Sequence, residues 1–166
     1  MKIALLKKYA DAIVTIGANV KKGQHVKISA SVEIADFVKY VVESAYKAGA
    51  EKVWVDWTFD AVTKLNYKYQ KTSVMSAVSA WQEAKLQEEV DVIPCRIVLL
   101  SDDPDGLKGI NLEKMQKVQQ AHYKVIKKYR DALDNKQQWT IAAVPSKAWA
   151  KKVFPDMRVS SAVESL

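Results

Sequence analysis

The chain has 166 residues, of which 49% are hydrophobic and 27% charged, as is typical of a globular protein rather than a disordered or fibrous one. Its single cysteine excludes an internal disulfide and indicates a reducing compartment, and no apolar run approaches the roughly 20 residues of a transmembrane helix. The net charge of +7 allows contact with nucleic acid or an anionic surface, but it also fits an uneven share of lysine in one part of a larger protein.

The first third of the chain alternates helical and β-prone patterns. Apolar residues recur at helical spacing in the first 20 residues, and Gly49 stands where a left-handed C-cap is expected. The predicted elements are a helix over Met1–Val20, a strand over His25–Ala30, a helix from Ser31 to about Ala48 and a strand over Lys52–Trp57.

The rest of the chain repeats this alternation. The predicted elements are a helical region over Phe59–Glu89 in two pieces broken near Lys71–Ser73, a strand over Cys95–Leu100, a helix from Asn111 to about Leu133, a strand over Trp139–Val144 and a short helix over Lys147–Phe154. The apolar stretch Cys95–Leu100 indicates a strand buried on both faces of a sheet. Cys95 itself is expected to be a small buried hydrophobe.

Strands that alternate with helices predict an α/β fold. We expect a mostly parallel sheet of four or slightly more strands, with helices on both faces. The arrangement is Rossmann-like but lacks a nucleotide fingerprint, because the junction Ile28–Glu33 has no glycine for close approach to phosphate.

The last ten residues predict a separate element. The α/β domain is expected to cover residues 1–156, with the linker around Pro155. Ser161 and Glu164 have the spacing of a capping box, which starts a helix. Residues 157–166 are therefore expected to begin a linker or helix that leads into a further domain.

The polar stretch Ser101–Gly109 follows the third strand and should lie at the carboxyl edge of the sheet, where open α/β folds bind ligands. Asp102, Asp103 and Asp105 could hold a cation or an amine, and Lys108 could meet a carboxylate. Turn formation by Asp, Pro and Gly explains the same residues. Both interpretations remain open on the sequence alone.

The two histidines are isolated from each other and from Cys95, so no zinc-type spacing exists. The sequence therefore predicts no catalytic and no metal-ligating residue in this chain. The helix from Asn111 carries many basic residues, interleaved with Tyr123 and Tyr129. That pattern is typical either of a solvated face with tyrosines on the buried side, or of a surface for single-stranded nucleic acid.

Four stretches resemble the thermophilic-metalloprotease family of aminopeptidases, which includes the aminopeptidase T, aminopeptidase S and PepS types. The matching stretches are Lys8–Gly17 continued by Val20–Gln24, Glu43–Trp57, Ser101–Ile110, and Trp139–Pro145 followed by Ala148–Pro155. The last run, Ala-Trp-Ala-Lys-Lys-Val-Phe-Pro, is the most specific, and the resemblance spans nearly the whole chain.

The resemblance implies a cytoplasmic exopeptidase with peptide substrates, generally a homodimer, that hydrolyses peptides with two divalent metal ions such as zinc or cobalt. In the family the metal ligands come from a C-terminal catalytic domain, so no metal is expected in this part. The chain would be the non-catalytic N-terminal domain, inactive alone, which shapes the substrate cleft and makes interdomain or dimer contacts. The resemblance gives no membrane role.

Four residues are the candidates for that role. Asp103, Lys108, Trp149 and Lys151 are predicted to contact the substrate cleft or the catalytic domain. Two other classes of function remain as alternatives: a standalone module for a small ligand or peptide, and, with less support, a basic nucleic-acid-binding domain. Binding that falls steeply with salt would identify the second alternative.

Overall fold

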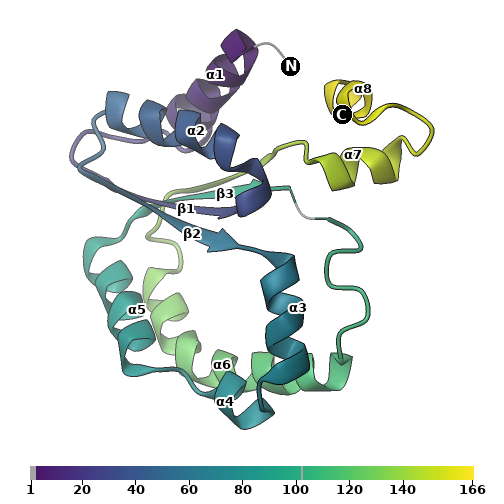
Figure 1. Cartoon of the computed structure of the whole chain (residues 1–166). Helices are drawn as coiled ribbons and strands as arrows, with labels where there is room; N and C mark the ends of the chain where they lie inside the picture. Colours follow the sequence, from purple (N-terminus) through teal and green to yellow (C-terminus); the bar gives the residue numbers. More distant parts are fainter. Residues whose placement is uncertain (1–2, 102) are drawn as a thin grey trace. The chain divides into compact units, whose positions relative to one another are not determined.

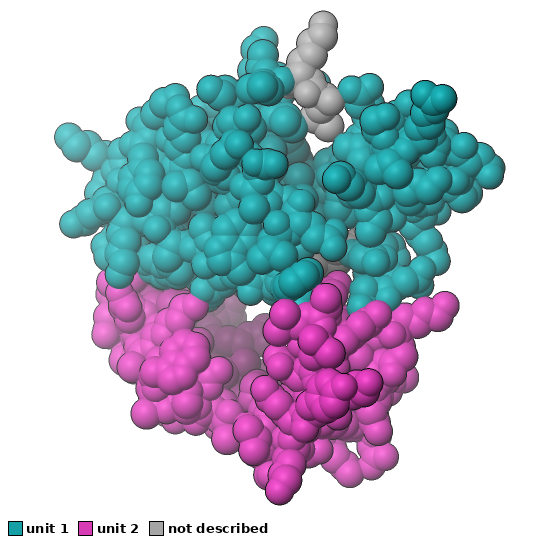
Figure 2. All heavy atoms as spheres, viewed as in Figure 1, with its two compact units in different colours: residues 1–59, 94–106, 138–166 teal, residues 60–93, 107–137 magenta. Residues whose placement is uncertain are grey.

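The computed structural model describes residues 3–101 and 103–166 of the chain (Figure 1). These residues form two compact units, which are coloured separately in Figure 2. The first unit comprises residues 1–59, 94–106 and 138–166, and the second comprises residues 60–93 and 107–137. The chain therefore leaves the first unit twice and returns to it twice.

A four-stranded parallel sheet forms the centre of the first unit. Its strands are β1 (His25–Ser31), β2 (Lys52–Thr58), β3 (Cys95–Leu100) and β4 (Trp139–Ala143), in the order β2-β1-β3-β4. Val26 pairs with Val53 on one side and with Cys95 on the other. This confirms the predicted α/β class and all four predicted strands.

Two helical segments pack on the sheet within the first unit. They are α1 (Ile3–Ala12), which continues as the π-helical turn η1 (Ile13–Gly17), and α2 (Ala35–Lys47), which follows the short 3₁₀ turn η2 (Val32–Ile34). The Ser31 hydroxyl accepts a hydrogen bond from the Glu33 N–H at 3.3 Å. The core between these elements is apolar, and its fully buried side chains include Val14, Val26, Ile28, Val41 and Ile97.

The strand β3 differs from the prediction of burial on both faces. Cys95, Ile97 and Leu99 are buried, but Arg96 is exposed and 43% of Leu100 is exposed. Their alternation shows that only one face of this strand belongs to the apolar core. The prediction that Cys95 is a small buried hydrophobe is confirmed, since the residue has no exposed surface.

The C-terminal part of the first unit holds two short helices, α7 (Lys147–Val153) and α8 (Val159–Ser165), which pack against each other. The predicted capping box at Ser161 is wrong, because α8 already begins at Val159 with Arg158 as its uncapped N-cap. Ser161 therefore lies inside the helix. The domain boundary at residue 156 stays a prediction.

The second unit is helical. It contains α3 (Asp60–Tyr69), α4 (Thr72–Ser76), α5 (Ala80–Val92) and α6 (Leu112–Leu133). The break predicted near Lys71 is present, and a second break precedes α5. Asn111 caps α6 as predicted, since its side chain accepts a hydrogen bond from the Lys114 N–H at 2.9 Å. Few residues of this unit are buried.

Candidate functional site

The loop after β3 forms a tight turn at the carboxyl edge of the sheet. The Asp105 N–H donates to the Asp103 carboxylate at 2.9 Å, and the Gly106 N–H donates to the Asp103 carbonyl at 2.8 Å. Asp102 lies outside the described residues. These bonds assign Asp103 a turn-forming role, as the turn interpretation of the sequence predicts.

An ion pair ties this loop to α7. The Lys152 ammonium lies 2.5 Å from the Asp105 carboxylate, and both side chains are about half exposed. The hydrogen bond that the Lys152 ammonium donates to the Asp105 carboxylate, and then the charge of that carboxylate, raise the pKa of Lys152, and the negative charge of Asp103 acts in the same direction. The pair positions the loop against the helix that also carries Trp149 and Lys151.

Trp149 and Lys151 have different surroundings on α7. Trp149 is partly exposed. Its backbone N–H donates to the Ser146 hydroxyl at 3.1 Å, and this bond caps the helix. The Lys151 ammonium donates to the carbonyls of Pro155 and Met157, at 3.0 Å for Met157. Lys151 therefore holds the connection between α7 and α8.

Ser101 ends β3 next to the same loop. Only 1% of the residue is exposed, and its hydroxyl has no hydrogen-bond partner among the described residues. A buried hydroxyl without a partner lowers stability, so such groups are uncommon in folded proteins. The carboxyl edge of the sheet thus combines a buried hydroxyl that has no partner among the described residues with a hydrogen-bonded acidic turn.

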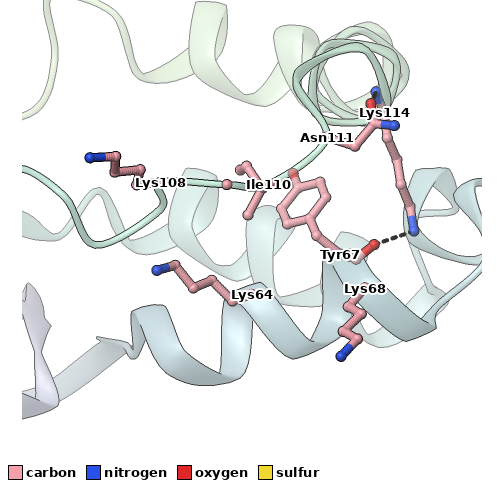
Figure 3. Close-up of a pocket in the computed structure, with 8 residues that line it drawn as sticks. Lys64, Tyr67, Lys68, Lys108, Ile110, Asn111 and Lys114 are labelled. Atoms are coloured by element: carbon pink, nitrogen blue, oxygen red, sulfur yellow. Dashed lines mark hydrogen bonds between the residues drawn. The ribbon is translucent and has the colours of Figure 1, made fainter.

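The fourth candidate, Lys108, belongs to the second unit. It lines a pocket of about 490 Å³ between α3 and the segment that leads into α6 (Figure 3). We call this the lysine pocket, and its lining residues are Lys64, Tyr67, Lys68, Lys108, Gly109, Ile110, Asn111 and Lys114. The structure thus separates the predicted residues into a group of three in the first unit and Lys108 in the second.

Sequence reasoning missed Lys152 and three of the four lysines of this pocket. Lys64 and Lys68 have the i, i+4 spacing of one helix face, which the sequence does reveal. The sequence does not reveal that this face meets residues 108–114, because that contact is tertiary. Lys152 was equally hidden, since its partner lies 47 residues away.

The described residues offer no metal site. Within residues 3–101 and 103–166, no three His, Cys, Asp or Glu side chains are grouped so that they could hold an ion. The two divalent ions that the family resemblance implies therefore do not fit any donor set of the described chain. Likewise, none of the described helices combines the length and apolar character needed to cross a lipid bilayer.

Several bacterial aminopeptidases match almost all of the chain in sequence. Aminopeptidase AmpS of Bacillus subtilis is 36% identical over 163 residues, which are 97% of this chain and 40% of the relative. Aminopeptidase PepS of Streptococcus thermophilus is 34% identical over 152 residues, which are 91% of this chain and 37% of the relative. The chain therefore spans about two-fifths of the length of these relatives.

A solved structure matches similar shares of the two chains. Wild-type AmpT from Thermus thermophilus superimposes with a TM-score of 0.85 at 27% identity, and the match covers 97% of this chain and 41% of that chain. In sequence, residues 3–166 match the thermophilic metalloprotease (M29) family from end to end. The chain belongs to the thermophilic metalloprotease (M29) family.

Proposed function

We propose that the chain is the N-terminal, non-catalytic part of a dinuclear metal-dependent aminopeptidase, which removes N-terminal residues from peptides. One observation carries the proposal: 97% of this chain aligns with AmpS, yet it accounts for only 40% of that aminopeptidase. The absence of a metal-ligand cluster among the described residues is consistent with ligands that lie in the remaining three-fifths.

The chemistry implied is metal-assisted hydrolysis. If the rest of the enzyme holds two divalent ions, zinc or cobalt for example, they would supply the Lewis-acid chemistry for water activation and carbonyl polarisation. Because the described residues do not fit these ions, no step of hydrolysis is assigned to a side chain of this chain. Its contribution is to bind and orient the peptide and to contact the catalytic part.

We assign that contribution to Asp103, Trp149 and Lys151 in the first unit and to Lys108 in the second. The Asp105–Lys152 ion pair supports this assignment, because it connects the loop that contains Asp103 to α7, which carries Trp149 and Lys151. The partly exposed indole of Trp149 is suited to pack against a peptide side chain or a neighbouring domain, because tryptophan offers a large apolar area with one polar atom.

The proposal includes a cytoplasmic homodimer, as the family resemblance implies. The edge strand β4 supports the idea of a contact surface, since Trp139 is 66% exposed and Ile141 is 53% exposed. Edge strands with exposed apolar side chains tend to pair with other chains unless they are covered. The catalytic part of the enzyme or a second copy would cover this strand.

The test is a chimaera in which this chain replaces the corresponding part of AmpS from Bacillus subtilis. The activity is measured as hydrolysis of leucine p-nitroanilide with added Zn²⁺ or Co²⁺. We expect no hydrolysis by this chain alone and clear hydrolysis by the chimaera. Hydrolysis by the isolated chain, or a folded and metal-loaded chimaera without activity, would contradict the proposal.

Matched variants of the chimaera test the residues. Trp149→Ala and Lys151→Met are expected to change KM about threefold to tenfold. Trp81→Ala in the second unit and Lys147→Met in the first, which alter the same residue types at other exposed positions, should leave KM unchanged. If Trp149→Ala and Lys151→Met lower only the melting temperature, with KM and kcat unchanged, these residues serve the fold and not the substrate cleft.

A further inference from the structure

The lysine pocket gathers four cations. Among the residues that the structure describes, its lining includes Lys64, Lys68, Lys108 and Lys114 and no Asp or Glu, and its volume of about 490 Å³ lies within the usual range for ligand sites. All of its residues belong to the second unit. A concave site lined by charges of one sign concentrates counter-ions, because the surrounding protein focuses the field.

Lys114 fixes the two walls of the pocket to each other. Its ammonium donates a hydrogen bond to the Tyr67 carbonyl at 2.6 Å (Figure 3) and another to the Gln70 carbonyl. These bonds join the first turn of α6 to the end of α3. The carbonyls satisfy the donors of Lys114 but do not cancel its charge, so the pocket remains positive.

Lys64 and Lys108 are the cations available to a ligand. Neither forms a hydrogen bond or ion pair within the described part of the chain, and Figure 3 shows both ammonium groups extending toward the same side of the pocket. Lys68 points away from them in that view, and its ammonium lies over the Tyr69 ring, 5.1 Å from the centroid. Two unpaired cations that share one side of a pocket repel each other, and an anion between them removes that repulsion.

The aromatic and apolar parts of the wall shape the rest of the site. Tyr67 and Ile110 lie between Lys64 and Lys108 on one side and Lys114 on the other (Figure 3). Such a wall suits the aliphatic stem of a peptide side chain, while the ammonium groups suit its carboxylate. None of the described residues that line the pocket is an arginine, which is the residue favoured for bidentate recognition of phosphate.

We propose that the lysine pocket binds the carboxylate of an acidic peptide, with Lys64 and Lys108 as its direct partners. The choice of a peptide rests on the proposed function, whereas the anion site rests on the pocket itself. Single-stranded nucleic acid fits less well, because its binding sites typically combine a basic groove with several stacking aromatics, and Tyr67 is the one aromatic among the described lining residues.

The test is direct binding by this chain, without any hydrolysis. The probes are the tripeptides Ala-Glu-Glu and Ala-Gln-Gln, which have nearly the same size, and binding is followed by calorimetry and by amide NMR shifts. We expect the acidic peptide to bind about tenfold more tightly, which corresponds to two partly exposed ion pairs. Its affinity should fall as NaCl is raised from 50 to 500 mM.

Two double variants with equal charge change locate the site. Lys64→Gln/Lys108→Gln should remove the preference for Ala-Glu-Glu, whereas Lys124→Gln/Lys136→Gln, in the same unit but outside the pocket, should preserve it. Circular dichroism establishes that both variants keep their helices. Equal loss of affinity in both variants would reduce the effect to net charge and overturn the proposal, as would equal affinity of the parent chain for the two peptides.

A single-stranded oligothymidylate is the competing probe. If it binds more tightly than Ala-Glu-Glu and loses affinity in Lys64→Gln/Lys108→Gln, the pocket is a nucleic-acid site and the peptide proposal fails. Because no catalysis is measured, failure here leaves the aminopeptidase proposal standing. An inactive chimaera would in turn leave the binding result unaffected.

Discussion

The two units of this chain are stabilised in different ways. The first has a continuous core in which Ile28, Ile97 and other side chains are fully buried around a parallel sheet. In the second, among the described residues, only Val118 and Tyr129 are buried apolar side chains, and α3 and α4 bury none. Burial of apolar area stabilises the first unit, and the second must depend more on polar contacts.

Several polar contacts of the second unit end on backbone carbonyls. Lys114 donates to Tyr67 and Gln70, and the His122 ring nitrogen lies 2.7 Å from the Met75 carbonyl. Each such bond contributes only about 0.5–3 kcal/mol. Because the second unit buries few apolar side chains, we expect it to open locally at a lower free energy than the first unit.

The largest effect should come from the core of the first unit. Ile28→Ala removes a fully buried side chain and leaves a cavity, so the free energy of unfolding should fall by about 2–5 kcal/mol in urea titrations. Ile141→Ala is the control, because that side chain is 53% exposed and its loss should cost no more than about 0.5 kcal/mol. Similar losses of unfolding free energy at both positions would contradict the assignment of Ile28 to the core and of Ile141 to the surface.

The second effect should be confined to the second unit. Lys114→Met keeps the length of the side chain but loses the bonds to the α3 carbonyls, so the opening free energy of α3 should fall by about 1–3 kcal/mol. Native-state hydrogen exchange of the α3 amides measures this change. Lys117→Met, which loses only an exposed pair with Glu113, should leave those amides unchanged. Equal acceleration in α2 would mean that the two units do not open separately.

The smallest effect concerns thiol chemistry. Cys95 is fully buried, and burial raises the pKa of its thiol, so Ellman's reagent should hardly react with the native chain at pH 8. In a Cys95→Ala chain, Val118→Cys places a thiol in the second unit at a position that is 5% exposed. It should react at least about tenfold faster, which corresponds to about 1.4 kcal/mol of opening free energy. If Cys95 reacted faster than the Val118→Cys thiol, the first unit would be the one that opens at the lower free energy.

The raised pKa of Cys95 also has a consequence for stability. The folded state retains the thiol proton to a higher pH than the unfolded state does. The protonated thiol therefore contributes stability to the folded state below the ordinary thiol pKa. This contribution is lost as the pH rises from the ordinary pKa through the raised pKa of the folded state. The free energy of unfolding should therefore decline over that alkaline range, and the Cys95→Ala chain should lack this part of the slope.

The strands were predictable because each carries its own signal. Alternating or apolar runs bounded by glycine or proline marked all four to within one residue of their ends. The division into two units was not predictable, since residues 60–93 meet residues 107–137 through tertiary contacts that leave no local pattern. For the same reason the sequence placed Lys108 with the loop of Asp103, although the two belong to different units.

Two capping-box motifs illustrate the limit of local signals. Ser79 and Gln82 have the same spacing as Ser161 and Glu164, and at α5 the Gln82 side chain accepts a hydrogen bond from the Ser79 N–H at 2.8 Å. At α8 the backbone is already helical from Val159, so Ser161 cannot take the extended conformation of an N-cap. The motif predicts a helix start only where the preceding chain is extended.

The strand order has a consequence for synthesis on the ribosome. β1 needs both β2 and β3 to complete its ladders, and the Tyr9 hydroxyl of α1 donates to the Ala143 carbonyl of β4, 134 residues later. A nascent chain grows at about 5–20 residues per second. The N-terminal helix therefore emerges many seconds before its last partner exists. The β4 strand of the first unit emerges only after both segments of the second unit, residues 60–93 and 107–137, have been synthesised.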